Sequence, residues 1–174
     1  MLVLAASIPL SAQSTAGIPI QFGVMGGRTQ PIGALAGAAN NDWNFGALAL
    51  LGGRESRLRF RLDGQWQQVA GKPNGGTLVC VTCGHTSYRR DYRVLDATAN
   101  AVFSSPVSSS AKVYLIGGVG VYNARGTNSE FPNAQVGPQT SSVTGFGINT
   151  GAGVSFGLGR HAGFVEARYH DLLG

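Results

Sequence analysis

The stretch that decides the fold reads Leu58-Arg59-Phe60-Arg61-Leu62-Asp63-Gly64-Gln65-Trp66. Its even positions hold apolar residues or glycine, and its odd positions hold charged or amide residues. Because successive side chains of a β-strand point to opposite faces of the sheet, this alternation predicts a strand with one apolar and one ionic face. The apolar face can pack against a protein core or against lipid, and that choice determines the class of protein.

The same alternation recurs along the chain and predicts seven strands, whereas no segment shows sustained helical periodicity. The predicted strands cover residues 18–28, 43–51, 58–69, 90–103, 112–124, 145–158 and 163–170. In the sixth strand a row of apolar residues from Phe146 to Leu158 lies opposite a row that is mostly glycine. We therefore expect an all-β fold with antiparallel neighbours.

The connections between these strands alternate between long and short. The long ones are 29–42, 70–89 and 125–144, and the short ones are 52–57, 104–111 and 159–162. Outer-membrane barrels have short turns at one rim and long loops at the other, whereas a soluble sandwich has no reason to keep this order. Most predicted strands also reach the ~9–11 residues that a tilted strand needs to cross a bilayer, above the ~5–6 of ordinary strands.

The two faces of the strands differ in chemistry. Charged side chains on the polar face are expected to point inward, where they can pair across a narrow lumen. The predicted interior charge network is Arg59, Arg61, Asp63, Asp96, Glu166 and Arg168. The predicted lipid-facing residues are Leu58, Phe60, Leu62, Trp66, Phe146, Ile148, Val154, Phe156 and Val165. The alternative is a soluble barrel with its aromatic residues inside and its charges outside.

Three segments in the last third of the chain carry a resemblance: Lys112–Tyr122, Gly145–Val154 and Phe164–His170. In order and spacing they resemble the fifth, sixth and seventh strands of the OmpA-like, opacity-type family of outer-membrane β-barrels. The resemblance implies an antiparallel up-and-down transmembrane β-barrel of the eight-stranded type, in the outer membrane of a Gram-negative-type bacterium. It implies no catalytic residues and no cofactor. The implied partners are outer-membrane lipid, the barrel-assembly machinery during insertion, and an unknown extracellular loop partner.

The two ends of the chain carry further expectations. Residues 1–12 combine an apolar run with small residues near Ala12, as a signal peptide does, which leaves 13–174 as the barrel domain. The alternative for residues 1–12 is a buried N-terminal strand. Since only seven strands are visible, we expect the final strand to be missing from a C-terminally truncated chain and both sheet edges to stay open.

Cys80 and Cys83 are a candidate disulfide, because exported chains meet oxidising conditions. Together with His85 they offer three metal ligands, fewer than the four of a structural zinc site, and we predict no metal site. His85 and Ser87 raise the alternative of an enzyme, but a serine nucleophile needs a base within reach and usually an orienting carboxylate.

The charge of the chain excludes one class of partner. Charged residues make up 12% of the sequence, about half of the ~25% usual for soluble domains, and the net charge of +5 is scattered. Nucleic-acid binding is not expected without a clustered basic stripe. The expected function is a non-enzymatic outer-membrane β-barrel that presents variable extracellular loops for envelope structure, adhesion or surface recognition. The alternatives are a soluble lipocalin-like barrel for an apolar ligand and an outer-membrane lipid-modifying enzyme.

Overall fold

A computed structural model describes the backbone of most of the chain. The described residues are 2–5, 11–12, 19–32, 37, 40–53, 55–72, 87–131, 139–158 and 161–173. Within this part of the chain the regular structure is β-strand. None of its segments is a helix long and apolar enough to cross a membrane.

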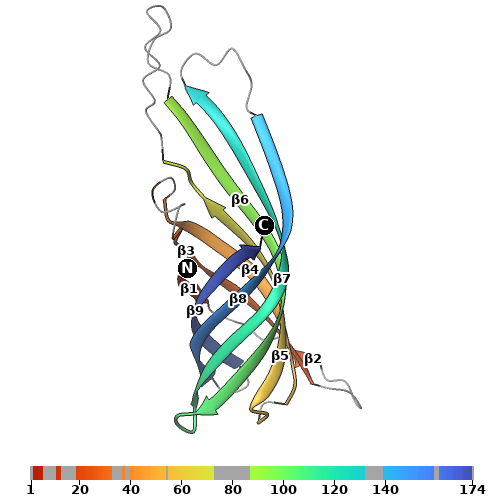
Figure 1. Cartoon of the computed structure of the whole chain (residues 1–174). Helices are drawn as coiled ribbons and strands as arrows, with labels where there is room; N and C mark the ends of the chain where they lie inside the picture. The colour runs from red at the N-terminus through yellow and green to blue at the C-terminus, as the bar shows by residue number, and fades with distance from the viewer. Residues whose placement is uncertain are drawn as a thin grey trace, which may run out of the picture.

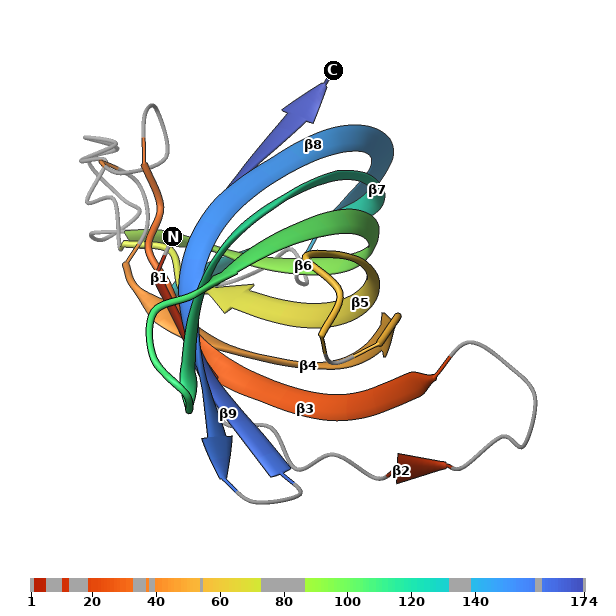
Figure 2. The ribbon, with the colours of Figure 1, turned by 90° about the horizontal axis from the view of Figure 1, so that it is seen from below.

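Seven long strands form one antiparallel sheet in which each strand pairs with the next in sequence. They are β3 (Ile20–Thr29), β4 (Asp42–Leu51), β5 (Leu58–Val69), β6 (Ser87–Pro106), β7 (Ala111–Phe131), β8 (Gln139–Leu158) and β9 (His161–Leu173). The sheet curls into a half-barrel, as the views in Figures 1 and 2 show. The predicted all-β, antiparallel, up-and-down architecture is confirmed.

The edges of this sheet differ from the expectation. The edge of β9 pairs with β1 (Leu2–Ala5), and the edge of β3 pairs with β2 (Ser11–Ala12). The N-terminal segment therefore covers part of each edge, four residues of β9 and two of β3, and the expectation of two open edges is wrong at these places. β1 also lies beside β3, between the first and the last of the long strands. The interpretation of residues 1–12 as a signal peptide stays a prediction.

Four strands are clearly longer than the alternation predicts, and β9 is the shortest of them at 13 residues. β6, β7 and β8 have 20, 21 and 20 residues, and Figure 1 shows them rising above the rest of the sheet. Residues 125–131 and 139–144, expected in a loop, continue the ladder, with Thr127 paired to Thr140. The predicted strands stop at residues 124 and 145 because the apolar alternation stops there. Backbone pairing continues beyond these positions through mostly polar residues.

The connections keep the predicted order. The short ones, 52–57, 107–110 and 159–160, join the strands at one end of the sheet, and the longer ones, 30–41, 70–86 and 132–138, join them at the other. The β6–β7 turn is at the bottom in Figure 1. Gly52 in the β4–β5 turn has a φ of 123°, a backbone conformation that disfavours side chains with a Cβ.

The concave and convex faces of the sheet have opposite chemistry. Buried side chains on the concave face are largely polar or charged, including Asn44, Arg61, Asp63, Gln65, Gln67, Asp96, Thr98, Asn100, Asn149, Glu166 and Arg168. The convex face carries large apolar side chains, of which Phe60 is 60% exposed and Phe146 is 72% exposed. Soluble proteins bury apolar residues and leave charges outside, so this distribution is inverted.

Candidate functional site: the ion-paired interior

Four charged side chains meet inside the curled sheet. Arg61 and Asp63 come from β5, and Glu166 and Arg168 come from β9; none of the four is more than 4% exposed. β5 and β9 are not neighbours in the sheet. Their side chains reach each other only because the sheet curls, so the cluster joins opposite walls of the half-barrel.

Each guanidinium in this cluster contacts both carboxylates. Arg61 donates two hydrogen bonds to Glu166, at 2.9 and 3.0 Å, and its Nε lies 2.8 Å from Asp63 Oδ1. Arg168 donates to Asp63 Oδ2 at 3.0 Å, and its Nη2 lies 2.6 Å from Glu166 Oε1. Two positive and two negative charges make the cluster neutral, which offsets the cost of burying ions.

Neutral side chains from two further strands complete the cluster. The Tyr114 hydroxyl on β7 donates to Glu166 Oε2 at 2.9 Å, and Asn100 Nδ2 on β6 donates to Asp63 Oδ2 at 2.7 Å. Tyr114 fits because its cross-strand partner is Gly153, where a Cβ would lie 2.5 Å from the tyrosine hydroxyl. The cluster therefore ties together β5, β6, β7 and β9.

Asp96 is buried but belongs to a separate polar chain nearer the long connections. Its Oδ2 accepts a hydrogen bond of 2.6 Å from Gln67 Nε2. Thr29 Oγ1 contacts Gln67 Oε1 at 3.4 Å and accepts from Asn44 Nδ2 at 2.9 Å. The predicted interior network is thus two separate groups, the four-charge cluster and this polar chain, in which Asp96 is bonded to the Gln67 amide.

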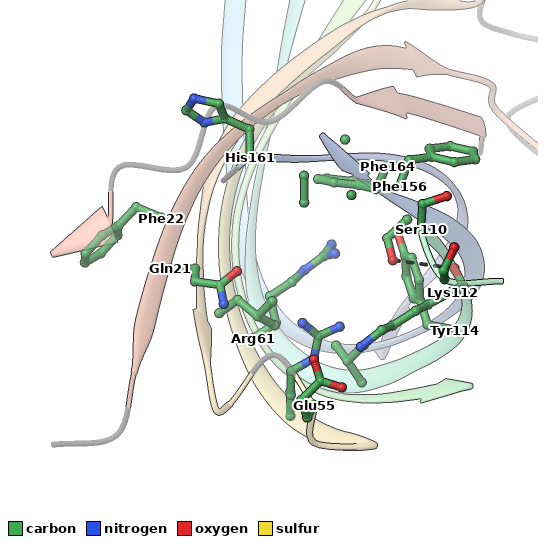
Figure 3. Close-up of a pocket in the computed structure, with 18 residues that line it drawn as sticks. Gln21, Phe22, Glu55, Arg61, Ser110, Lys112, Tyr114, Phe156, His161 and Phe164 are labelled. Atoms are coloured by element: carbon green, nitrogen blue, oxygen red, sulfur yellow. Dashed lines mark hydrogen bonds between the residues drawn. The ribbon is translucent and has the colours of Figure 1, made fainter. Parts of the chain in front are cut away.

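Arg59 lies at the other end, beside a cavity of about 290 Å³ near the short connections. Its Nη2 donates to Ser104 Oγ at 3.1 Å. Figure 3 shows Arg61, Lys112, Tyr114 and Phe164 around this cavity, and the Arg61 guanidinium lies 5.4 Å from the Phe164 ring centre. Arg61 of the ion-paired cluster and Tyr114 therefore form part of the wall of this cavity.

The predicted lipid-facing residues all lie on the convex face. Seven of them, Leu58, Phe60, Leu62, Phe146, Ile148, Phe156 and Val165, are exposed, and Trp66 and Val154 are partly buried. Trp66 stacks on Phe45 with ring centres 4.8 Å apart. Two arginines lie over convex-face tryptophans, Arg28 over Trp43 at 5.4 Å and Arg93 over Trp66 at 5.8 Å.

Sequence reasoning missed Tyr114, whose strand is so rich in glycine that its faces were not assigned. A signal was available: Tyr114 and Tyr122 are eight residues apart and share one face, and small residues oppose both. The second tyrosine contacts His170 Nδ1 through its hydroxyl at 2.9 Å. On β7, the two tyrosines opposite glycines of β8 therefore mark the concave face.

Several sequence predictions fall outside this site. Cys80, Cys83 and His85 lie outside the described residues, and Ser87 is the first residue of β6. The disulfide and enzyme hypotheses stay predictions. In the described part of the chain, no three side chains of the metal-ligating types come together.

Comparison of the chain with protein-family models, with curated proteins and with solved structures gives no match.

Proposed function

We propose that this chain is a non-enzymatic β-barrel that spans the outer membrane of a Gram-negative-type bacterium and presents its long connections outside the cell. The inverted sheet carries the proposal: ion pairs fill the concave face, while large apolar side chains cover the convex face. Each large apolar side chain moved out of water gains about 1.5–3 kcal/mol. Lipid against the convex face provides that gain for many side chains at once.

The lengths of the strands support a membrane-spanning sheet. β3, β4 and β5 have 10, 10 and 12 residues, close to the ~9–11 that cross a bilayer at a tilt of about 45°. Short connections at one end and longer ones at the other match the rims of outer-membrane barrels. In this orientation the short connections face the periplasm.

The pairing of the edges supports closure. Lipid cannot satisfy backbone N–H and C=O groups, so a sheet in a bilayer must leave no open edge. β1 pairs with β9 over four residues and lies beside β3, at the position that an eighth strand would take, so it covers part of the gap between them. Eight strands make the smallest barrels of this type, and side chains fill their interior.

The soluble alternative requires the reverse arrangement of side chains. A lipocalin-like barrel for an apolar ligand needs an apolar interior and a charged exterior. Here Arg168 and Glu166 are each 2% exposed inside the sheet, whereas Phe60 points outward. The distribution of charge therefore favours the membrane protein.

The proposal is tested by refolding the purified chain with lipid vesicles. We expect the protein to float with the vesicles after a urea wash and to migrate faster on gels before heating than after it. A stable monomer in detergent-free buffer would contradict the proposal.

The orientation is tested with a membrane-impermeant maleimide on intact cells. After reduction, we expect labelling of Cys80 and Cys83 in the wild type and none in the C80S/C83S variant. Adding Ser109→Cys, in the short β6–β7 turn, to that variant should restore labelling only after the cells are broken. Labelling of Ser109→Cys in intact cells would contradict the orientation.

A further inference from the structure

Two arginines lie directly opposite each other on the convex face. Arg93 of β6 and Arg125 of β7 are paired in the ladder, and both are exposed. Like charges at directly opposed positions destabilise a sheet. A bound anion that contacts both guanidinium groups would remove this repulsion.

These arginines border a depression of about 250 Å³ on the sheet surface. Its lining residues are Gln68, Asp91, Tyr92, Arg93, Arg125, Thr127 and Thr140. The hydroxyl oxygens of Thr127 and Thr140 lie 3.4 Å apart. Asp91 is the one carboxylate in this lining, and its Oδ1 accepts a hydrogen bond from the Gly71 amide at 3.1 Å. Two guanidinium groups, an amide and hydroxyls are the donors that bind phosphate oxygens.

The depression lies where the apolar part of the convex face ends. One step along the same face of β6 toward the short connections is Leu95, which is 58% exposed and paired with Trp66. On β7 the face changes from Val121 to Asn123 and then to Arg125. Arginine above a tryptophan and an apolar band is the arrangement found where lipid headgroups begin.

We propose that Arg93 and Arg125 bind the phosphate group of a lipid in the outer leaflet. This inference rests on the proposed membrane orientation, which puts the depression at headgroup level on the side of the long connections. The apolar band directly below it receives the acyl chains of the same lipid, which distinguishes a lipid phosphate from free phosphate.

The test compares wild type with R93Q/R125Q and with R28Q. Arg28 is a matched control, because it is an exposed convex-face arginine over a tryptophan but does not line the depression. Each protein is refolded in detergent with equal amounts of phosphatidic acid and of diacylglycerol with the same chains. Native mass spectrometry then measures the lipid that each protein retains.

We expect wild type and R28Q to retain phosphatidic acid in preference to diacylglycerol, and R93Q/R125Q to retain roughly tenfold less of it. Equal retention by all three proteins would overturn the inference. Displacement of the lipid by an equal concentration of inorganic phosphate would overturn the assignment to a lipid. Vesicle flotation of the same samples separates the two hypotheses. If the wild-type protein does not float with the vesicles, the proposed function is overturned. If it floats but all three proteins retain the same amount of phosphatidic acid, this inference alone is overturned.

Discussion

The two faces of a single strand, β5, have opposite chemistry. On its concave face Arg61 and Asp63 have partners on β9 at hydrogen-bond distance, whereas on its convex face Phe60 and Leu62 are more than half exposed. The inner residues are held by specific partners. The outer residues need only an apolar surrounding. Substitutions on the inner face should therefore change stability by breaking specific contacts. Substitutions on the outer face should change it only through how well the new side chain suits an apolar surrounding.

The largest effect is expected inside, from Arg168→Met. This change leaves Asp63 and Glu166 with one guanidinium between them, and breaking a buried ion pair in this way costs about 3–5 kcal/mol. Urea unfolding of the lipid-inserted protein measures the loss in free energy of unfolding. Tyr169→Phe, the neighbouring convex-face change, should lower stability by less than about 0.5 kcal/mol.

A double variant sharpens this test. Combining Arg168→Met with Glu166→Leu removes one charge of each sign, so it should recover part of the loss seen in R168M. If the double variant is less stable than R168M, the cluster does not act as a neutral set of compensating charges.

The next largest effect is expected outside, from Leu62→Arg. In lipid, an arginine near the middle of the apolar band should cost about 2–4 kcal/mol. The measurement is the free energy of unfolding from vesicles, with Leu62→Ala as the control for lost side-chain volume. If L62R is as stable as L62A, the convex face is in water. That result would contradict the proposal that the outer face of β5 contacts lipid.

The smallest effect compares one glycine from each face. A Cβ at Gly153 would meet Tyr114 at 2.5 Å, whereas a Cβ at Gly64 meets nothing within 4 Å. Gly153→Ala should therefore cost about 1–3 kcal/mol through overpacking, and Gly64→Ala should be close to neutral. Unfolding midpoints of the two variants in the same detergent test this. Equal midpoints would mean that the interior is loosely packed around Tyr114.

Much of the fold follows from local pattern, because alternation depends only on neighbouring residues. The faces of β5 and β9 were predictable from Leu58–Trp66 and Phe164–His170. The interior charges were predicted as one set that includes Arg61 and Glu166, 105 residues apart. Which of these charges meet was not predictable, because the contacts form only when the sheet curls, and Asp96 lies with Gln67 instead. A strand within residues 1–12 was only the alternative expectation, because an apolar N-terminal run has the same composition in a signal peptide and in a strand, and its pairing with β9 was not foreseen.

The unequal extents of β5 and β6 bear on where a bilayer would end. The ladder between these two strands ends at Tyr92, although β6 begins at Ser87. Among the described residues, 87–91 therefore pair with a strand on the β7 side alone. Water satisfies exposed backbone groups and hydrocarbon does not. In the proposed orientation the end of this ladder therefore sets an upper limit for the bilayer surface, from backbone hydrogen bonding and independently of any side chain.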